Sequence, residues 1–250
     1  MTAEAPVIEV EGLGKVFQAP GGVGDLLRGR LFRPPVEALT DISFTVAPGE
    51  VVCMMGPNGA GKSTLARILG GLLLPSAGRV FVAGADAREA TSVFRQRVAF
   101  VIGDERSFHF QVSGRENLHY FAALHGLPAR EGRRRAAALL ERVGLGEAAD
   151  RRFKEYSRGM RQRLAIARGL LGDPVVLLLD EPTLGLDPRG ARDMRIFLRD
   201  EVIRGAGRTA VVCSNDPNEV RALGDRVLFL ERGRLRSQAP PERIEAELGL

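Results

Sequence analysis

The chain has 250 residues, of which 44% are hydrophobic, and this is enough to bury the core of one α/β domain with a smaller lobe. Its net charge of +5 comes from arginine, because lysine occurs only at Lys15, Lys62 and Lys154. No apolar run approaches the roughly 20 residues that span a bilayer, and the first residues lack the pattern of a signal peptide, so neither a membrane-spanning nor a secreted chain is expected.

The first predicted strand alternates over 7–10 and resumes over 15–17. Phe17 ends this strand, and an aromatic side chain there either stacks on a purine or fills the core. From 18 to 37 the chain is rich in glycine, proline and arginine, which predicts a mobile loop. Apolar and basic side chains alternate over 25–33, so a short amphipathic segment that rests against lipid or a membrane partner is the other interpretation.

Two further strands follow, over 42–46 and 51–55, with a turn expected at 48–50. Because only this turn separates them, we expect a hairpin. Cys53 lies in the second of these apolar runs and Cys213 lies in a later one. We therefore expect two buried thiols in a reducing, cytoplasmic compartment rather than a disulfide.

A glycine-rich loop lies between the run 51–55 and an amphipathic helix pattern, which is the order of a phosphate-binding strand, loop and helix. In this loop, glycines let backbone N–H groups turn inward, Lys62 reaches the outer phosphates of a polyphosphate, and Ser63 ligates Mg²⁺. The N-terminus of the next helix adds a partial positive charge. The residues expected at this site are Gly56, Pro57, Asn58, Gly59, Ala60, Gly61, Lys62, Ser63 and Thr64.

The segment 86–172 has a mainly helical pattern, and phosphate binding does not require these helices. We interpret it as a lobe inserted into the nucleotide-binding domain. Ser113 and Glu116 match a capping box at the start of one helix. The arginines at 133–135 lie among helix-forming residues without interleaved aromatics, which favours a solvated helix face over a nucleic-acid or lipid surface. No nucleic acid is expected as a partner.

The wholly apolar run 175–179 predicts a strand buried on both faces of a parallel sheet, and it ends in Asp180 and Glu181. Ligands bind at the carboxyl ends of such strands. Asp180 is suited to hold Mg²⁺ through water, and Glu181 is suited to act as general base for an attacking water. Two exposed acids before a turn are the simpler interpretation, but it leaves unexplained why they end the most apolar strand of a chain with a phosphate loop.

These motifs, in this order, make the chain resemble the ATP-binding cassette (ABC) family over nearly its whole length. The resemblance rests on the phosphate loop, the strand 175–181, the signature-like segment 157–162 and the segment 181–187. The signature form is similar to that of bacterial ABC-2 type exporters of drugs, lipids or polysaccharides, whose membrane subunits are separate chains. The family implies one α/β domain over 1–250, with a P-loop NTPase core, a parallel sheet, an antiparallel β subdomain at its edge and an inserted helical lobe.

The resemblance also implies a second nucleotide-binding subunit in a head-to-tail dimer, expected to be a homodimer. Phe17 matches the aromatic residue that stacks on adenine, and Asp187 matches the acid of a loop that crosses the dimer. The helical lobe would receive an integral membrane permease, which makes the chain a peripheral subunit at the cytoplasmic face of the cell membrane. ATP would lie between Lys62, Ser63 and Asp180 of one copy and Ser157, Gly159 and Met160 of the other.

Two positions depart from the family pattern. Asp104 stands where the family usually has a glutamine that touches Mg²⁺, and it is either a metal ligand or a plain loop residue. Asn215 stands where the family has a histidine at the γ-phosphate, which predicts slow hydrolysis.

Three functions therefore compete. The first is an ATP-hydrolysing subunit that powers an exporter. The second is a nucleotide-gated structural module with little hydrolysis, or one half of an asymmetric heterodimer. The third is a translation or DNA-repair relative, which is disfavoured because such proteins usually have tandem cassettes, zinc cysteines or coiled-coil insertions, and this chain has none.

Overall fold

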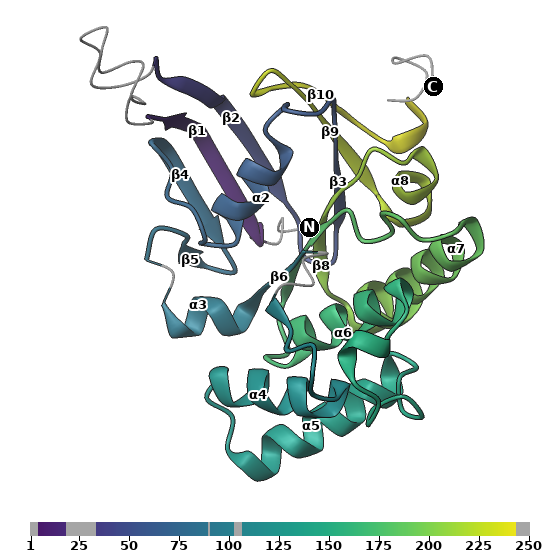
Figure 1. The fold of residues 1–250 in the computed structure, drawn as a ribbon. Helices are drawn as coiled ribbons and strands as arrows, with labels where there is room; N and C mark the ends of the chain where they lie inside the picture. Colours follow the sequence, from purple (N-terminus) through teal and green to yellow (C-terminus); the bar gives the residue numbers. More distant parts are fainter. Residues whose placement is uncertain (1–4, 19–33, 90, 103–106, 244–250) are drawn as a thin grey trace, which may run out of the picture.

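The computed structural model describes residues 5–18, 34–89, 91–102 and 107–243. Its strands form one six-stranded sheet and one four-stranded sheet, with helices packed around the larger one (Figure 1). The expected α/β fold, with a parallel core and an antiparallel subdomain at its edge, is confirmed.

The six-stranded sheet has the order β10-β9-β3-β8-β7-β6 and is parallel except where β10 runs antiparallel to β9. Its strands are β3 (Val51–Met55), β6 (Val98–Ile102), β7 (Val176–Asp180), β8 (Thr209–Cys213), β9 (Arg226–Glu231) and β10 (Arg234–Ala239).

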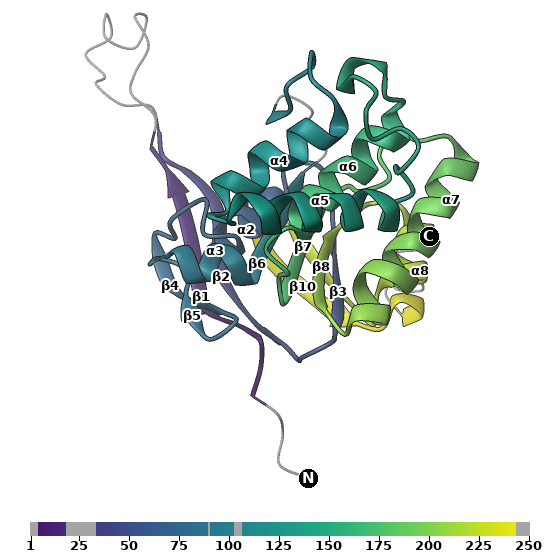
Figure 2. The same ribbon diagram turned by 90° about the horizontal axis from the view of Figure 1, so that it is seen from below.

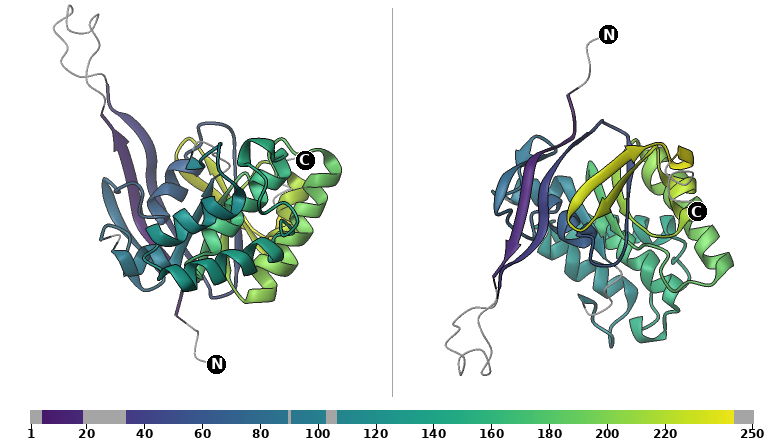
Figure 3. Two further views of the ribbon diagram at one scale, coloured as in Figure 1. Left: turned by 60° about the horizontal axis from the view of Figure 1, so that its bottom comes forward. Right: turned by 90° about the horizontal axis from the view of Figure 1, so that it is seen from above.

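The four-stranded sheet is antiparallel and has the order β2-β1-β4-β5. Its strands are β1 (Ile8–Phe17), β2 (Val36–Val46), β4 (Ala77–Val82) and β5 (Ala85–Asp86). The antiparallel pair β1 and β2 runs along one flank of the molecule, with the helices near the C-terminus on the opposite flank (Figure 3). β1 is one strand with irregular pairing, where the sequence pattern suggested two runs.

The hairpin expected between 42–46 and 51–55 is wrong. The turn between them exists, since the N–H of Glu50 donates to Ala47 O at 3.2 Å, but the strands that it joins enter different sheets. β2 alternates buried and exposed residues near its end, whereas all five residues of β3 are buried. A strand buried on both faces belongs inside the larger sheet, so the two strands separate after the turn.

Helices surround the larger sheet, and α4, α5 and α6 lie together on one side of the molecule (Figure 2). The capping box at Ser113 and Glu116 is confirmed. The segment 86–172 also contains β6, which pairs with β7, so part of this segment belongs to the core sheet. The helices are α2 (Lys62–Leu69), α3 (Ser92–Arg97), α4 (Gly114–Leu124), α5 (Ala129–Arg142), α6 (Arg158–Leu170), α7 (Pro188–Phe197), the π-helix η3 (Leu198–Ile203) and α8 (Pro217–Leu223), with short 3-10 turns η2 (Phe153–Glu155) and η4 (Arg204–Ala206).

The side chains of β3 alternate between two hydrophobic clusters, which explains its unbroken apolar sequence. One cluster includes side chains of α6 and the helical lobe, and the other includes α2 and the four-stranded sheet. Burial on both faces fixes β3 at the centre of the fold and fixes the start of the loop that follows it. The first cluster receives Val51, Cys53 and Met55, and the second receives Val52 and Met54.

Both cysteines are free and buried, as expected. Burial raises the pKa of each thiol well above its usual value, so both stay protonated. Within the described ranges, none of the helices has the length and apolar character required to cross a bilayer.

Candidate nucleotide site

The phosphate loop is pressed between two other parts of the chain, and only glycine fits at its ends. Gly56 has φ of 145°, and a Cβ there would lie 2.0 Å from the carbonyl oxygen of Leu230. Gly61 has φ of 104°, and a Cβ there would lie 2.6 Å from the Leu39 side chain. Side chains would push the loop away from β9 and β2, so glycine at both positions lets the backbone close tightly.

Lys62 is held inside this loop. Its Nζ donates to Gly56 O and to Pro57 O, the latter at 3.3 Å. Burial lowers the pKa of Lys62, while the nearby Glu181 and Asp180 carboxylates favour the charged form. The loop therefore curls around its own ammonium group, in the arrangement that the G-x-x-x-x-G-K-S spacing predicts.

The two carboxylates expected at the end of β7 diverge because the backbone turns between them. Glu181 has φ of 48°, in the left-handed region that residues other than glycine seldom adopt. Its N–H donates to Cys213 O at 2.9 Å, which holds this turn against the end of β8. Burial raises the pKa of the Cys213 thiol, and the negative charge of the nearby Asp180 carboxylate raises it further. Strained backbone of this kind is typical of functional sites.

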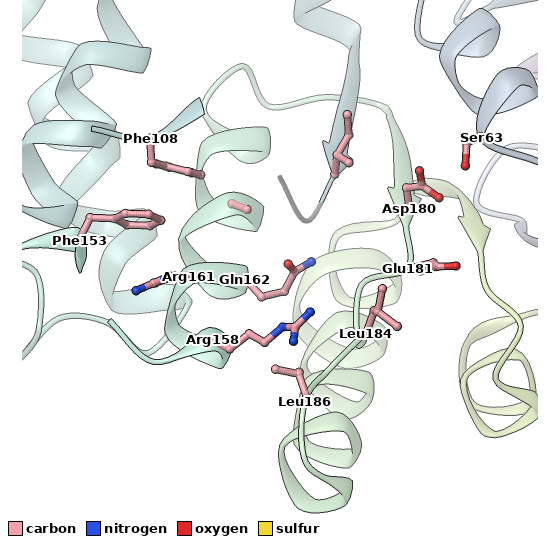
Figure 4. Close-up of a pocket in the computed structure, with 12 residues that line it drawn as sticks. Ser63, Phe108, Phe153, Arg158, Arg161, Gln162, Asp180, Glu181, Leu184 and Leu186 are labelled. Carbon is pink, nitrogen blue, oxygen red and sulfur yellow. The ribbon is translucent and has the colours of Figure 1, made fainter. Parts of the chain in front are cut away.

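Ser63, Asp180 and Glu181 lie on one side of a cavity of about 480 Å³. Figure 4 shows these three side chains across the cavity from Arg158, Arg161 and the aromatic rings of the helical lobe. Hydroxyl and carboxylate oxygens are the ligands that Mg²⁺ prefers, and both Ser63 and Asp180 are half-buried and accessible. The cavity is lined by Ser63, Ile102, Phe108, Phe153, Arg158, Arg161, Gln162, Ala165, Asp180, Glu181, Leu184 and Leu186.

Asn215 lies at the phosphate loop. Its Oδ1 accepts a hydrogen bond from the N–H of Gly56 at 3.4 Å, and the residue is exposed. The end of β8 therefore brings the position that departs from the family pattern to the mouth of the phosphate site.

The signature segment divides at this point: Arg158, Arg161 and Gln162 line the cavity, but the three residues expected at the nucleotide do not. Ser157 caps α6, with its Oγ accepting from the N–H of Met160 at 3.3 Å, and it is exposed. Among the described residues that line the cavity, Ser157, Gly159 and Met160 are not found, and Met160 lines a separate surface recess instead. Asp187 caps α7 by accepting from the N–H of Gly190 at 2.8 Å. One copy of the chain thus assembles the phosphate side of the site but not the signature side.

Phe17 is half-exposed at the end of β1, where it pairs with Val36. The Nζ of Lys15 lies 5.0 Å from the centre of its ring. A side chain that is 41% exposed is not a core residue, so the interpretation of Phe17 as core is wrong. Asp104, and the segment 25–33 expected to be amphipathic, lie outside the described residues.

Sequence reasoning missed two features, one at the phosphate loop and one on α8. One is the β9–β10 hairpin, where Leu230 O of β9 lies close to Gly56 and the N–H of Gly233 in the turn donates to Ala60 O at 3.1 Å. No local pattern links a turn near residue 232 to a loop near residue 58. The other is Glu219, which is 1% exposed. A single acid in a short helix has the pattern of a solvated side chain, so nothing in the sequence marks its burial.

Comparison with known proteins agrees with this geometry. A family model described as ABC transporter matches residues 39–184. The daunorubicin resistance ATP-binding protein DrrA3 of Streptomyces coeruleorubidus is 41% identical over 214 residues, which cover 85% of this chain and 66% of that protein. The ABC transporter ATP-binding protein NatA of Bacillus subtilis (strain 168) is 38% identical, with 84% of this chain and 87% of NatA covered. The chain thus spans about two thirds of the length of DrrA3.

Among solved structures, a dimeric ATP-binding cassette in a post-hydrolysis state, bound to ADP and Pi, superposes with a TM-score of 0.78 at 26% identity. The match covers 94% of this chain and 98% of that one. The family match spans more than half of the chain and includes the phosphate loop and the β7 carboxylates. The chain therefore belongs to the ABC transporter family.

Proposed function

We propose that the chain is the ATP-binding and ATP-hydrolysing subunit of an exporter whose permease is a separate membrane protein. The observation that carries this proposal is the meeting of Ser63, Asp180 and Glu181 at one cavity, next to a loop curled around Lys62. Phosphate binding, metal binding and base catalysis each have a suitable group there.

The chemistry divides among these residues. The N–H groups of the glycine loop and the Lys62 ammonium oppose the negative charge of the outer phosphates. Ser63 and Asp180 would hold Mg²⁺, which supplies positive charge to the transferring phosphoryl group. Glu181 accepts the proton of the attacking water.

The missing signature side would come from a second copy. The N-terminus of α6 is exposed, and a helix N-terminus favours a phosphate anion. Ser157, Gly159 and Met160 of one copy would then face the phosphate loop of the other in a head-to-tail homodimer, with Asp187 near the crossing. The dimeric cassette bound to ADP and Pi supports this arrangement for a chain of the same fold.

The partner and the cargo follow from the relatives. A relative named for daunorubicin resistance supports export, and the signature form is similar to that of drug, lipid and polysaccharide exporters. The chain would then dock by its helical lobe on an integral permease, as a peripheral subunit at the cytoplasmic face of the cell membrane.

Asn215 favours a second candidate, a nucleotide-gated structural module or the inactive half of a heterodimer. Asparagine is shorter than histidine and cannot become cationic, so it would stabilise developing phosphate charge less well. Because the general base Glu181 is present, we favour a subunit that hydrolyses ATP slowly over one that does not hydrolyse it.

Steady-state hydrolysis of Mg-ATP by the full chain, compared with its Glu181→Gln variant, tests the choice. Loss of a general base lowers the rate about 10²–10⁴-fold, while the variant should still bind ATP and accumulate as a closed dimer. If the wild type is already as slow as Glu181→Gln, also with a permease present, the hydrolase fails and the structural module replaces it.

A further inference from the structure

The turn between β9 and β10 is hydrogen-bonded to the phosphate loop, although the proposed mechanism assigns it no part. The N–H of Gly233 donates to Ala60 O at 3.1 Å, and Gly233 O accepts from the N–H of Thr40 at 2.8 Å. Figure 3 shows the hairpin in yellow beside β2, the strand that contains Thr40. One buried residue of the turn therefore links the phosphate loop to β2.

The backbone of the turn permits this close approach. Arg232 and Gly233 have φ of 48° and 75°, and positive φ at both central residues is the pattern of a two-residue type I′ hairpin turn. A Cβ on Gly233 would lie 2.7 Å from Ala38 O, which is closer than a carbon and an oxygen approach without a bond. Any side chain at this position would therefore push the hairpin away from β2.

The bond from Gly233 fixes the peptide unit that joins Ala60 to Gly61. A peptide unit is planar and trans, so the C=O of Ala60 and the N–H of Gly61 point in opposite directions. With its oxygen held by the turn, this unit directs the Gly61 N–H away from the hairpin. That N–H has no hydrogen-bond partner among the described residues, and no side chain caps the start of α2. It is therefore available to a phosphate oxygen.

We propose that the β9–β10 turn positions the phosphate loop, with Gly233 as a positioning residue that acts through the Ala60–Gly61 peptide. Gly233 does not touch the nucleotide. Because such coupling is reciprocal, a triphosphate that accepts from the Gly61 N–H should in turn stabilise the bond from Gly233 to Ala60 O. The inference rests on the proposed binding of phosphates by this loop, and it adds a distant segment of the chain that this binding requires.

A second hairpin of the chain offers a matched control. In the turn between β4 and β5, Ala83 and Gly84 have φ of 52° and 78°, close to the angles of Arg232 and Gly233. A Cβ on Gly84 would meet no atom within 4 Å. Alanine at Gly84 therefore has nearly the same backbone strain as alanine at Gly233, but it does not displace the turn.

The test compares Gly233→Ala, Gly84→Ala and wild type as full-length chains, by calorimetric titration with ATP and with inorganic triphosphate in the presence of Mg²⁺. Gly233→Ala should release Ala60 O, so both ligands should bind about tenfold more weakly, as expected for the loss of one hydrogen bond to an anion. The ratio of the two affinities should not change, because the turn does not act on the base. Gly84→Ala should bind both ligands as wild type, although it should lose thermal stability through the same strain.

Hydrogen exchange tests the same link in the unaltered chain, and it decides the matter if Gly233→Ala does not fold. Saturating inorganic triphosphate should slow exchange in a peptide that covers 231–235, although this turn does not touch the ligand. A peptide that covers 82–86, in the control hairpin, should exchange at the same rate with and without triphosphate.

Three outcomes would overturn the inference. The first is Gly233→Ala binding triphosphate as tightly as Gly84→Ala does. The second is a loss of ATP affinity in Gly233→Ala with triphosphate affinity retained. The third is unchanged exchange at 231–235 in a wild type that binds triphosphate. Each of these leaves the proposed function in place, whereas a wild type that binds neither ATP nor triphosphate defeats the proposed function and this inference together.

Discussion

The phosphate loop and the start of α6 are the two halves of the proposed nucleotide site, but only the first is enclosed by its own chain. Leu39 and Leu230 approach Gly61 and Gly56, and Lys62 donates to carbonyls within the loop. At the start of α6, Ser157 is exposed and caps only its own helix. The difference indicates that one half of the nucleotide site is complete within the chain and that the other half is available to a second copy.

A substitution in the enclosed half should have the largest effect on ATP binding and hydrolysis. Lys62→Ala removes the only lysine of the loop and the charge that opposes the outer phosphates, so detectable Mg-ATP binding or turnover should be lost. Equilibrium binding of ATP and steady-state hydrolysis measure this. Exposed Lys154→Ala is the matched control and should retain both. Unchanged binding and turnover in Lys62→Ala would remove the basis of the nucleotide site.

A substitution in the exposed half should affect hydrolysis only where two copies form the site together. A Cβ at Gly159 would lie 3.9 Å from the Leu186 side chain, an ordinary contact, so Gly159→Asp should fold. Its carboxylate would face the phosphates of the partner's nucleotide and block turnover through like-charge repulsion.

Mixing two inactive variants distinguishes a site shared between copies from one within a copy. Heterodimers of Lys62→Ala and Gly159→Asp contain one intact site if each site takes its loop from one copy and its signature from the other. The mixture should regain about a quarter of wild-type hydrolysis, because about half of the dimers are mixed and each has one working site. No recovery, with dimers confirmed by sedimentation, would contradict the head-to-tail arrangement.

A similar contrast explains which features of the fold and the site could be predicted from the sequence. The strand, loop and helix around Lys62 are contiguous in sequence, so the phosphate site could be predicted. An unbroken run of apolar residues in β7 indicates burial on both faces, so this strand and the carboxylates at its end could be predicted too. Strand pairing is not local, which is why the sequence pattern around the turn after Val46 predicts a hairpin although the two strands enter different sheets. The approach of Leu230 to Gly56 and the burial of Glu219 depend on packing between segments far apart in the chain, and they leave no pattern of their own.

The next largest effect is expected at Asn215, where a substitution should raise kcat. Asn215→His places an imidazole where Oδ1 now meets the N–H of Gly56, and the ring can donate to a γ-phosphate whose charge increases in the transition state. Removal of one such donor costs other enzymes about 10²–10³-fold, so a gain of about tenfold in kcat is expected. ATP affinity should change little, because the added interaction acts mainly in the transition state. Unaltered kcat in a folded variant would show that this position does not limit turnover.

Phe17 should give the smallest effect, because it lies at the edge of the enclosed half. Its strand partner β2 also supplies Leu39, which packs against Gly61, so the half-exposed ring lies on the strand pair that borders the phosphate loop. Base stacking on an aromatic side chain contributes about 1–3 kcal/mol, and a ring open to solvent on one side should give about 1 kcal/mol. Phe17→Ala should therefore weaken ATP binding about fivefold, with Phe17→Tyr close to wild type and triphosphate affinity unchanged. Equal loss of ATP and triphosphate binding would show that Phe17 supports the loop rather than the base.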